Sequence, residues 1–185
     1  KALVIGKDLQ TSLSIRGVPP GAPISLTSSD STAVLFANGG QAPGAPTLVV
    51  NASAGGSASI SIQSLKDQGE TTVRIRVPGQ PDTEVPVTHV ASGILLSAAV
   101  TSAGVISSLG VAVAPLDEVT ATPLLPQALR PGVTAEVRLR TEGSPLTLNP
   151  NAVTLTNALS SASIVFAPLP PGAETLITAE AAGFT

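Results

Sequence analysis

One short sequence occurs twice in this chain, at a fixed distance. Residues 57–60 read Ser-Ala-Ser-Ile, and residues 161–164 read the same. The match continues at the same separation of 104 residues through three further pairs: Leu65 and Leu169, Glu70 and Glu174, and Gly79 and Gly183. Self-similarity at about a hundred residues, the size of one β-sandwich, indicates two copies of one structural unit in tandem.

Apolar and polar residues alternate along short segments of both copies. Val73, Ile75 and Val77 are separated by arginines in the first copy, and Val137 and Leu139 alternate with arginines in the second. Period-two alternation is typical of half-buried strands. Clusters of glycine and proline separate these segments, and no stretch of a dozen residues keeps the apolar period of a helix. The sequence predicts an all-β fold.

The composition favours a thin sandwich over an enzyme with a deep pocket. Hydrophobic residues make up 43% of the chain but aromatic residues only 2%, so the core is built from Val, Ile, Leu and Ala. Charged residues make up 11%, against roughly 25% in ordinary globular proteins. Serine and threonine hydroxyls therefore solvate much of the surface.

Charge and cysteine content restrict the partners. A net charge of -3 attracts neither nucleic acid nor anionic membranes, so we expect no nucleic-acid partner. The longest apolar region is interrupted by Ser, Thr and Gly, so we expect no membrane insertion. The absence of cysteine excludes disulfides and thiolate metal sites and leaves the compartment open. Because small secreted eukaryotic domains usually carry disulfides, an exported bacterial protein is the better fit.

The repeat divides the chain into two expected domains, residues 1–91 and residues 92–185. The linker around residues 91–93 is short, so the domains are expected to stand end to end with limited bending. Ile24 and Val137, which occupy similar contexts, lie 113 residues apart, so the first copy carries about nine extra residues. We assign them to a loop or edge excursion within residues 32–46. A further strand is predicted at residues 83–90, and the second domain is expected to lack its counterpart.

Three segments resemble bacterial immunoglobulin-like repeats, the Big-type repeats of large secreted and cell-surface proteins. They are residues 26–35 (Leu-Thr-Ser-Ser-Asp-Ser-Thr-Ala-Val-Leu), residues 56–60 and residues 69–73. The family also has a Gly-aromatic pair near the end of each copy, found here as Gly183-Phe184 but replaced in the first copy by Gly79-Gln80. The resemblance implies two tandem immunoglobulin-like β-sandwich domains with no catalytic motif.

A catalytic role is not expected, and we predict that the chain is not an enzyme. His89 is the single histidine, and a Ser-His-Asp arrangement with Asp82 is arithmetically available. However, the chain has no Gly-x-Ser-x-Gly elbow and no predicted helix to follow one. His89 shares strand parity with Val85 and Val87, so we interpret it as a structural residue on the inward face near the junction.

Two sets of charged residues are candidate binding sites. Asp82 and Glu84 share a strand face and are candidate calcium ligands, although an Asp-x-Asp-x-Asp-Gly loop is absent. No other cofactor is expected. Four arginines form two outward pairs that could bind the carboxylates or sulfates of a polysaccharide, or could simply keep exposed strands soluble: Arg74, Arg76, Arg138 and Arg140. Neutral sugars are disfavoured because the chain has no Trp or Tyr.

Three functions remain open at this point. The first is a non-catalytic structural or spacer module of a larger bacterial secreted or surface protein, whose partners are other domains of the same polypeptide. The second is an adhesin module that binds a surface glycan or protein through the arginine faces, the loop or an exposed edge. The third is an accessory domain of a larger extracellular enzyme. All three predict an extracellular or cell-surface location.

Overall fold

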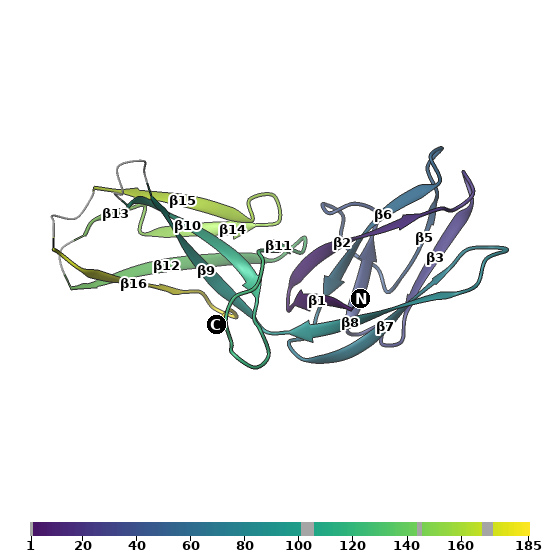
Figure 1. Cartoon of the computed structure of the whole chain (residues 1–185), viewed down its shortest axis with the longest axis horizontal. Coiled ribbons are helices and arrows are strands. Elements are labelled where there is room, and N and C mark those ends of the chain that lie inside the picture. Colours follow the sequence, from purple (N-terminus) through teal and green to yellow (C-terminus); the bar gives the residue numbers. More distant parts are fainter. Residues whose placement is uncertain (1, 101–105, 144–145, 168–171) are drawn as a thin grey trace.

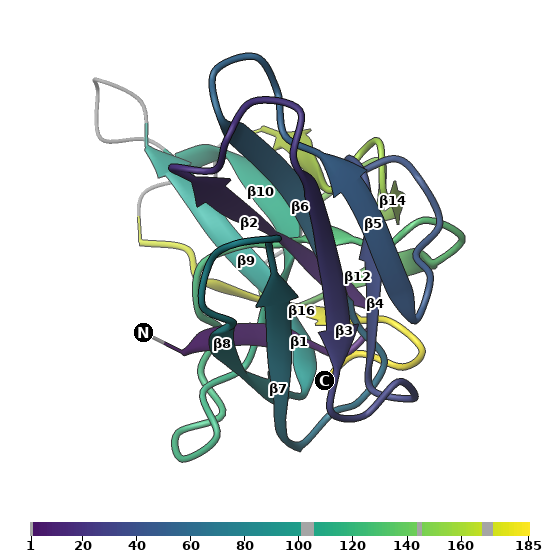
Figure 2. The same cartoon turned by 90° about the vertical axis from the view of Figure 1, so that its right-hand side faces the viewer.

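The computed structural model describes residues 2–100, 106–143, 146–167 and 172–185, and within these ranges the chain is all-β. We refer to residues 2–90 as the N-terminal half and to residues 92–185 as the C-terminal half. Figure 1 shows the two halves end to end along the long axis, and Figure 2, viewed from the N-terminal half, shows one behind the other. The prediction of an all-β chain is confirmed.

Two sheets form the N-terminal half. The larger has the order β1-β8-β7-β3-β5, with β1 (Leu3–Gly6), β8 (Thr83–Val90), β7 (Gly69–Arg76), β3 (Pro23–Ser28) and β5 (Thr47–Asn51). The other has the order β11-β2-β6-β4, with β11 (Ala128–Leu129), β2 (Leu9–Arg16), β6 (Ser57–Ser64) and β4 (Val34–Ala37). Strand β11 belongs to the C-terminal half by sequence, and its place in this sheet links the two halves.

Two further sheets form the C-terminal half. One has the order β13-β15-β10-β9, with β13 (Leu148–Asn149), β15 (Ser161–Phe166), β10 (Ile106–Pro115) and β9 (Ser92–Val100). The other has the order β14-β12-β16, with β14 (Ala152–Thr156), β12 (Thr134–Gly143) and β16 (Thr175–Glu180). All pairings in these two sheets are antiparallel, whereas β1 pairs with β8 in parallel.

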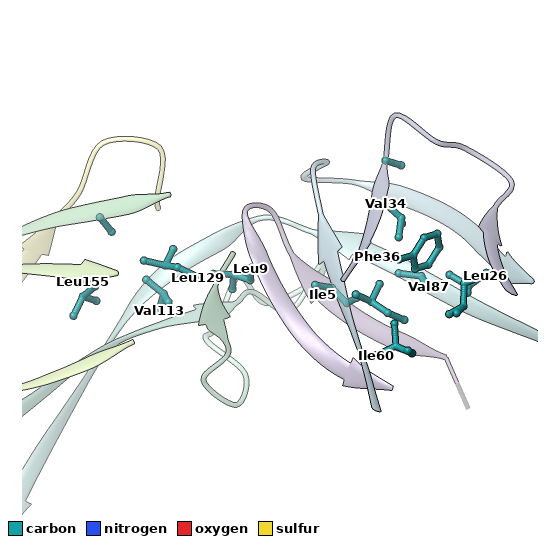
Figure 3. Packing of buried hydrophobic residues seen from close by; sticks show 14 of the residues in the cluster. Ile5, Leu9, Leu26, Val34, Phe36, Ile60, Val87, Val113, Leu129 and Leu155 are labelled. Atoms are coloured by element: carbon teal, nitrogen blue, oxygen red, sulfur yellow. The ribbon is translucent and has the colours of Figure 1, made fainter. Parts of the chain in front are cut away.

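Alternating side chains of these strands build the core. In β7, Val73 and Ile75 are buried while Arg74 and Arg76 are exposed, as period-two alternation requires. Phe36 is fully buried at the centre of the N-terminal half, and Figure 3 shows it beside other buried side chains. The buried apolar residues form one cluster that continues from one half into the other. The two halves therefore share a core at their junction.

The repeated sequence occupies corresponding strands of the two halves. Ile60 in β6 pairs with Leu13 in β2, and Ile164 in β15 pairs with Leu109 in β10. The other sheet of each half agrees. Leu26 pairs with Ile75 in the N-terminal half, and Leu139 pairs with Ala179 in the C-terminal half. The first partners, Leu26 and Leu139, lie 113 residues apart in the sequence, and the second partners, Ile75 and Ala179, lie 104 residues apart. These are the two separations seen in the sequence. Leu169, another member of the repeat, lies outside the described residues.

Of the two alternatives predicted for residues 32–46, a continuous loop is wrong, because β4 lies inside this range as an edge strand of its sheet. Phe36 of β4 pairs with Ile62, as Leu148 of β13 pairs with Phe166, so β4 belongs to the shared framework. The extra residues fall in the loop of residues 38–46, between β4 and β5. An apolar residue at alternate positions, Val34 and Phe36, was the signal for this short strand.

Candidate functional site

The junction between the halves is held by contacts between segments that lie more than a hundred residues apart in the sequence. Ala128 and Leu129 of β11 pair with Gln10 and Leu9 of β2. Leu9 and Leu129 are both fully buried, and Figure 3 shows their side chains next to one another. A strand of the C-terminal half thus extends a sheet of the N-terminal half. Burial of two leucines adds an apolar contact to the backbone pairing.

An ion pair lies beside this strand. The Nε and Nη2 atoms of Arg130 are both 2.7 Å from Oδ1 of Asp8, and the two side chains are only 27% and 28% exposed. The Arg130 backbone N–H also donates to the Asp8 carbonyl. Asp8 has a φ of 61°, a left-handed conformation that Asp tolerates better than most residues. The β1–β2 turn therefore presents its carboxylate to the other half.

A side-chain amide extends the junction to β1. Gln127 donates from Nε2 to the Val4 carbonyl at 2.8 Å, and its Oε1 accepts from the Gly6 N–H at 3.3 Å. Ser92 donates to the Lys7 carbonyl at 2.7 Å. A Cβ atom at Gly6 would lie 3.1 Å from the Cα of Pro115, so the close approach of the halves requires glycine there. The linker between β8 and β9 is thus reinforced by several contacts.

His89, the candidate catalytic base, is fully buried in β8. Its Nδ1 lies 2.8 Å from the Ser64 hydroxyl and its Nε2 lies 2.9 Å from the Thr71 hydroxyl. The Ser64 hydroxyl donates to the Lys66 carbonyl, so it must accept from Nδ1–H. A serine nucleophile would need the opposite arrangement, with the imidazole accepting its proton. The geometry fits a neutral histidine satisfied within the core.

Burial is the main cause that lowers the pKa of His89 below its usual value of 6.5. The positive charge of Lys66 lowers the pKa further, and the negative charge of Asp30 opposes this change. A lowered pKa and two hydroxyl partners both favour the neutral ring. Sequence parity therefore placed this side chain on the inward face correctly.

The candidate anion site of β7 lies beside the candidate calcium ligands, which are at the start of β8 and directly before it. Arg74 donates from Nη2 to Oε1 of Glu84 at 2.9 Å. Arg76 donates from Nε to Oδ1 of Asp82 at 3.2 Å and from Nη2 to Oδ2 at 3.0 Å. This pairing lowers the pKa of the Asp82 carboxyl below its usual range. The sequence analysis gave these residues as two separate candidate sites, one for anions and one for calcium, and the structure shows their charges facing one another. A shallow, open hollow of about 370 Å³ lies between Arg74 and residues of β3.

The arginines of β12 have partners too. Arg138 lies 3.0 Å from Glu136 on the same face of β12, and Arg140 lies 2.9 Å from Glu180 of β16. All of these side chains are more than half exposed. Exposed ion pairs of this kind contribute little to stability, so their main effect is to keep the outer face hydrophilic.

The candidate calcium ligands Asp82 and Glu84 have no third acidic or histidine side chain converging on them in the described ranges. Within those ranges, no group of three or more His, Asp or Glu side chains converges as a cation would need. Asp82 and Glu84 are instead neutralised by arginines. Nor does any helix in the described ranges have the length and apolar character needed to cross a membrane.

Comparison with known proteins gives a loose structural similarity. No family model matches the chain, and a search of the curated proteins finds no significant match. Among solved structures, the D0-D1 domain of Intimin shares 15% identity at a TM-score of 0.36, covering 98% of this chain and 88% of that one. Surface layer protein SbsC, domains 4-9, shares 13% at 0.39, covering 96% and 29%.

The Yersinia pseudotuberculosis adhesin InvE shares 13% identity at a TM-score of 0.35, covering 98% of this chain and 54% of that one. The chain therefore spans under a third of the SbsC structure and about half of the InvE structure. Similarity at this level assigns no function. The resemblance to bacterial immunoglobulin-like repeats stays a prediction from the sequence motifs.

Proposed function

We propose that the chain is a pair of tandem immunoglobulin-like domains that serves as a non-catalytic spacer in a larger bacterial secreted or surface protein. The observation that carries this proposal is the junction. Strand β11, the Arg130–Asp8 pair and the Gln127 amide hold two elongated halves end to end (Figure 1). A spacer works by holding the parts that it connects in a fixed relative orientation, and a flexible linker would not do so.

Bending at the junction would break several interactions at once. Leu9 and Leu129 would become exposed, which costs about 1.5–3 kcal/mol for each leucine that leaves an apolar environment. The backbone pairing of β11 with β2 and the partly buried ion pair would also be lost. Because these contacts join the halves in addition to the covalent linker at residue 91, they oppose rotation about it.

The surface supports a spacer more than an adhesin. Arg74, Arg76, Arg138 and Arg140 each bind a carboxylate of the same chain, so an incoming anion would have to displace that partner. The single histidine is enclosed in the core. Both features leave few unpaired or reactive side chains at the surface, as a spacer requires.

Distance measurement by pulsed electron resonance would test the stiffness. The chain has no cysteine, so labels placed by Val49→Cys and Val165→Cys, at residues 66% and 61% exposed, would be specific to one site in each half. We expect one narrow distance distribution, which Leu129→Asp broadens. Leu125→Asp, at a residue 84% exposed, is the matched control and leaves the distribution narrow. A broad distribution in the unaltered junction would refute a rigid spacer.

Binding assays would separate the spacer from the adhesin. Purified protein is tested against a panel of acidic polysaccharides and intact cells, with and without calcium. A spacer shows no saturable binding in any of these conditions. Saturable binding that is lost on combining Arg74→Gln with Arg76→Gln would establish an adhesin role and locate its site.

A further inference from the structure

Strand β5 lies at the end of the five-stranded sheet of the N-terminal half, beside β3 (Figure 2). Among the described residues, no strand pairs with the other side of β5. The segments that precede and follow this strand in the sequence are both described, so the open edge does not arise at an end of the chain.

The other strand edges of the N-terminal half are covered within the chain. Gln127 bonds the outer backbone groups of β1, at the Val4 carbonyl and the Gly6 N–H. Phe36 of β4 exchanges both backbone hydrogen bonds with Ala45, at 2.8 and 2.9 Å. Strand β11 pairs with the outer side of β2. Proteins cover sheet edges because unpaired backbone groups recruit other strands. Among the described residues, β5 is the edge of this half without such a cover.

The backbone of β5 directs every second residue toward the open edge. Ala52, which directly follows β5, donates its N–H to the Ala22 carbonyl at 2.9 Å and continues the register with β3. In an antiparallel ladder, residues bonded to the neighbouring strand alternate with residues whose backbone groups point away from it. Three residues of β5 therefore point their N–H and carbonyl groups outward: Thr47, Val49 and Asn51. No backbone hydrogen bond from the described residues reaches these groups.

The side chains of β5 leave this edge unprotected. Charged residues, especially lysine, and proline are the usual devices that prevent edge pairing. Residues 47–51 contain none of them, and Val49 is 66% exposed. Pro46 precedes the strand, but it has the parity of Leu48, so its missing N–H does not lie on the open edge.

We propose that β5 pairs antiparallel with β5 of a second copy of this chain, so that two five-stranded sheets join across a two-fold axis at Val49. This register places Val49 opposite Val49 of the partner subunit and Thr47 opposite Asn51 of the partner subunit. The outward backbone groups of the two strands then face one another. Leu48 and Val50, which are partly buried against the core, continue the apolar layer into the partner. This interface does not depend on the spacer role.

The charge pattern favours a second copy as the occupant. A two-fold interface places the same surface on both sides, so a charge on the edge would meet a like charge. The sequence has no charged residue between Asp30 and Lys66, and this stretch supplies β4, β5 and β6. A partner recognised by its charge would find no ionic group on β5. The neutral strand is therefore suited to pairing with itself.

Sedimentation of the whole chain from about 5 to about 300 µM tests this pairing. One pair of short edge strands is a small interface, so we expect a reversible dimer with a Kd on the order of 10–100 µM. At low micromolar concentration the chain is then mostly monomeric, so labels and substitutions at Val49 report there on the single chain.

A lysine at the two-fold axis should separate the copies. Val49→Lys places like charges directly opposite one another and should weaken the dimer at least about tenfold. The matched control is Val165→Lys, at a residue that is 61% exposed on β15, a strand with neighbours on both sides. This control should leave the association unchanged.

Disulfide formation locates the contact independently. The chain has no cysteine, so Val49→Cys supplies a single thiol. Opposite residues of a hydrogen-bonded antiparallel pair have Cα atoms about 5.5 Å apart, a separation that a disulfide can span. Mild oxidation at concentrations that populate the dimer should cross-link Val49→Cys and leave Val165→Cys mostly unlinked.

The two readouts together decide the proposal. A dimer that Val49→Lys alone weakens and that Val49→Cys cross-links supports the interface. A monomer over the whole concentration range overturns it and leaves the β5 edge to a strand of another protein. A dimer that resists Val49→Lys, that both lysine variants weaken equally, or that Val49→Cys does not cross-link uses another surface and also overturns it. Growth beyond a dimer overturns it too, because a two-fold strand pair closes with two copies.

Discussion

The two halves of the molecule use the same strand registers but close their cores differently. In the N-terminal half, β8 and β1 cover the outer edge of β7, and Val73 and Val87 are fully buried. In the C-terminal half, the described residues place no strand beyond β16, and Ile177 is half-buried. A shared strand register therefore does not ensure that the cores of the two halves are covered equally. The burial of a strand depends on the neighbour beyond it as well as on its own sequence.

The largest expected difference concerns the core residues of β4 and β13. Phe36 is fully buried and Leu148 is 9% exposed at the corresponding place. Phe36→Ala should cost about 3–5 kcal/mol of unfolding free energy because it leaves a large cavity. Leu148→Ala should cost less, near the lower end of the ~2–5 kcal/mol range for buried leucines, because a looser site collapses more readily. Urea denaturation followed by circular dichroism measures both.

Val49→Ala is the control for this comparison, since Val49 is 66% exposed on β5 and should change stability little. Equal losses for the two core variants would show that the two halves are packed equally well. The coverage of β7 by β8, which has no counterpart at β16 among the described residues, would then have no effect on the stability of the core.

The two glycine turns give a smaller contrast. A side chain at Gly79 or Gly183 would meet no neighbour, but each residue has a positive φ. The left-handed strain costs about 1–2 kcal/mol at a residue that cannot relax. Gly79→Ala should show that loss because β7 and β8 fix the turn on its two sides, whereas Gly183→Ala should show less. Thermal unfolding compares them, and a greater loss at Gly183 would contradict the idea that β8 fixes the first turn.

A pH effect should be confined to the N-terminal half, which holds the single histidine. Burial lowers the pKa of His89 in the folded protein below the value of 6.5 that applies when the chain is unfolded. Below pH 6.5 the unfolded chain therefore binds a proton that the folded chain does not, and stability decreases as the pH falls toward the folded pKa.

Unfolding free energies measured between pH 7.5 and pH 5 would show this slope, and His89→Gln should reduce it. The carboxyl pKa values of Asp82 and Asp117 are lowered too, but these groups act only below their usual value of 3.8. An unchanged slope in the variant would mean that His89 is not the group responsible.

The smallest effects are expected at the outer ion pairs. Arg74 lies 2.9 Å from Glu84 in the first half, and Arg140 lies 2.9 Å from Glu180 in the second. Both pairs are exposed and screened by solvent, so Arg74→Gln and Arg140→Gln should each change the melting temperature by less than about 2 °C. A larger change in one half would show that its pair is coupled to the strand edge beneath it.

The extra residues of the first half illustrate how a repeat can be interrupted without loss of register. The loop of residues 38–46 is held by side chains of the neighbouring sheet. Gln63 donates to the Ala42 carbonyl at 3.0 Å and Gln10 donates to the Gly40 carbonyl at 2.8 Å. The sequence located the insertion but missed β4, because a strand of four residues leaves little periodicity to recognise.

The sequence by itself determined the local order of this protein. The alternation around Val73 and Val137, the repeat at residues 57–60 and 161–164, and the turn glycines specify which residues form strands and which side faces inward. Such features depend on near neighbours in the chain, so they leave a readable pattern. The inward orientation of His89 is a local feature of the same kind, because it follows from the position of this residue in the alternating strand.

Only the tertiary structure decided how the halves are joined and which charges meet. Asp8 and Arg130 are separated by more than a hundred residues, as are Leu9 and Leu129, and no local pattern marks them as partners. The candidate sites at Arg74 and Glu84 looked independent until the register of β7 and β8 placed them opposite one another. Contacts between distant segments depend on the folded arrangement of the whole chain, so no local pattern in the sequence could have predicted them.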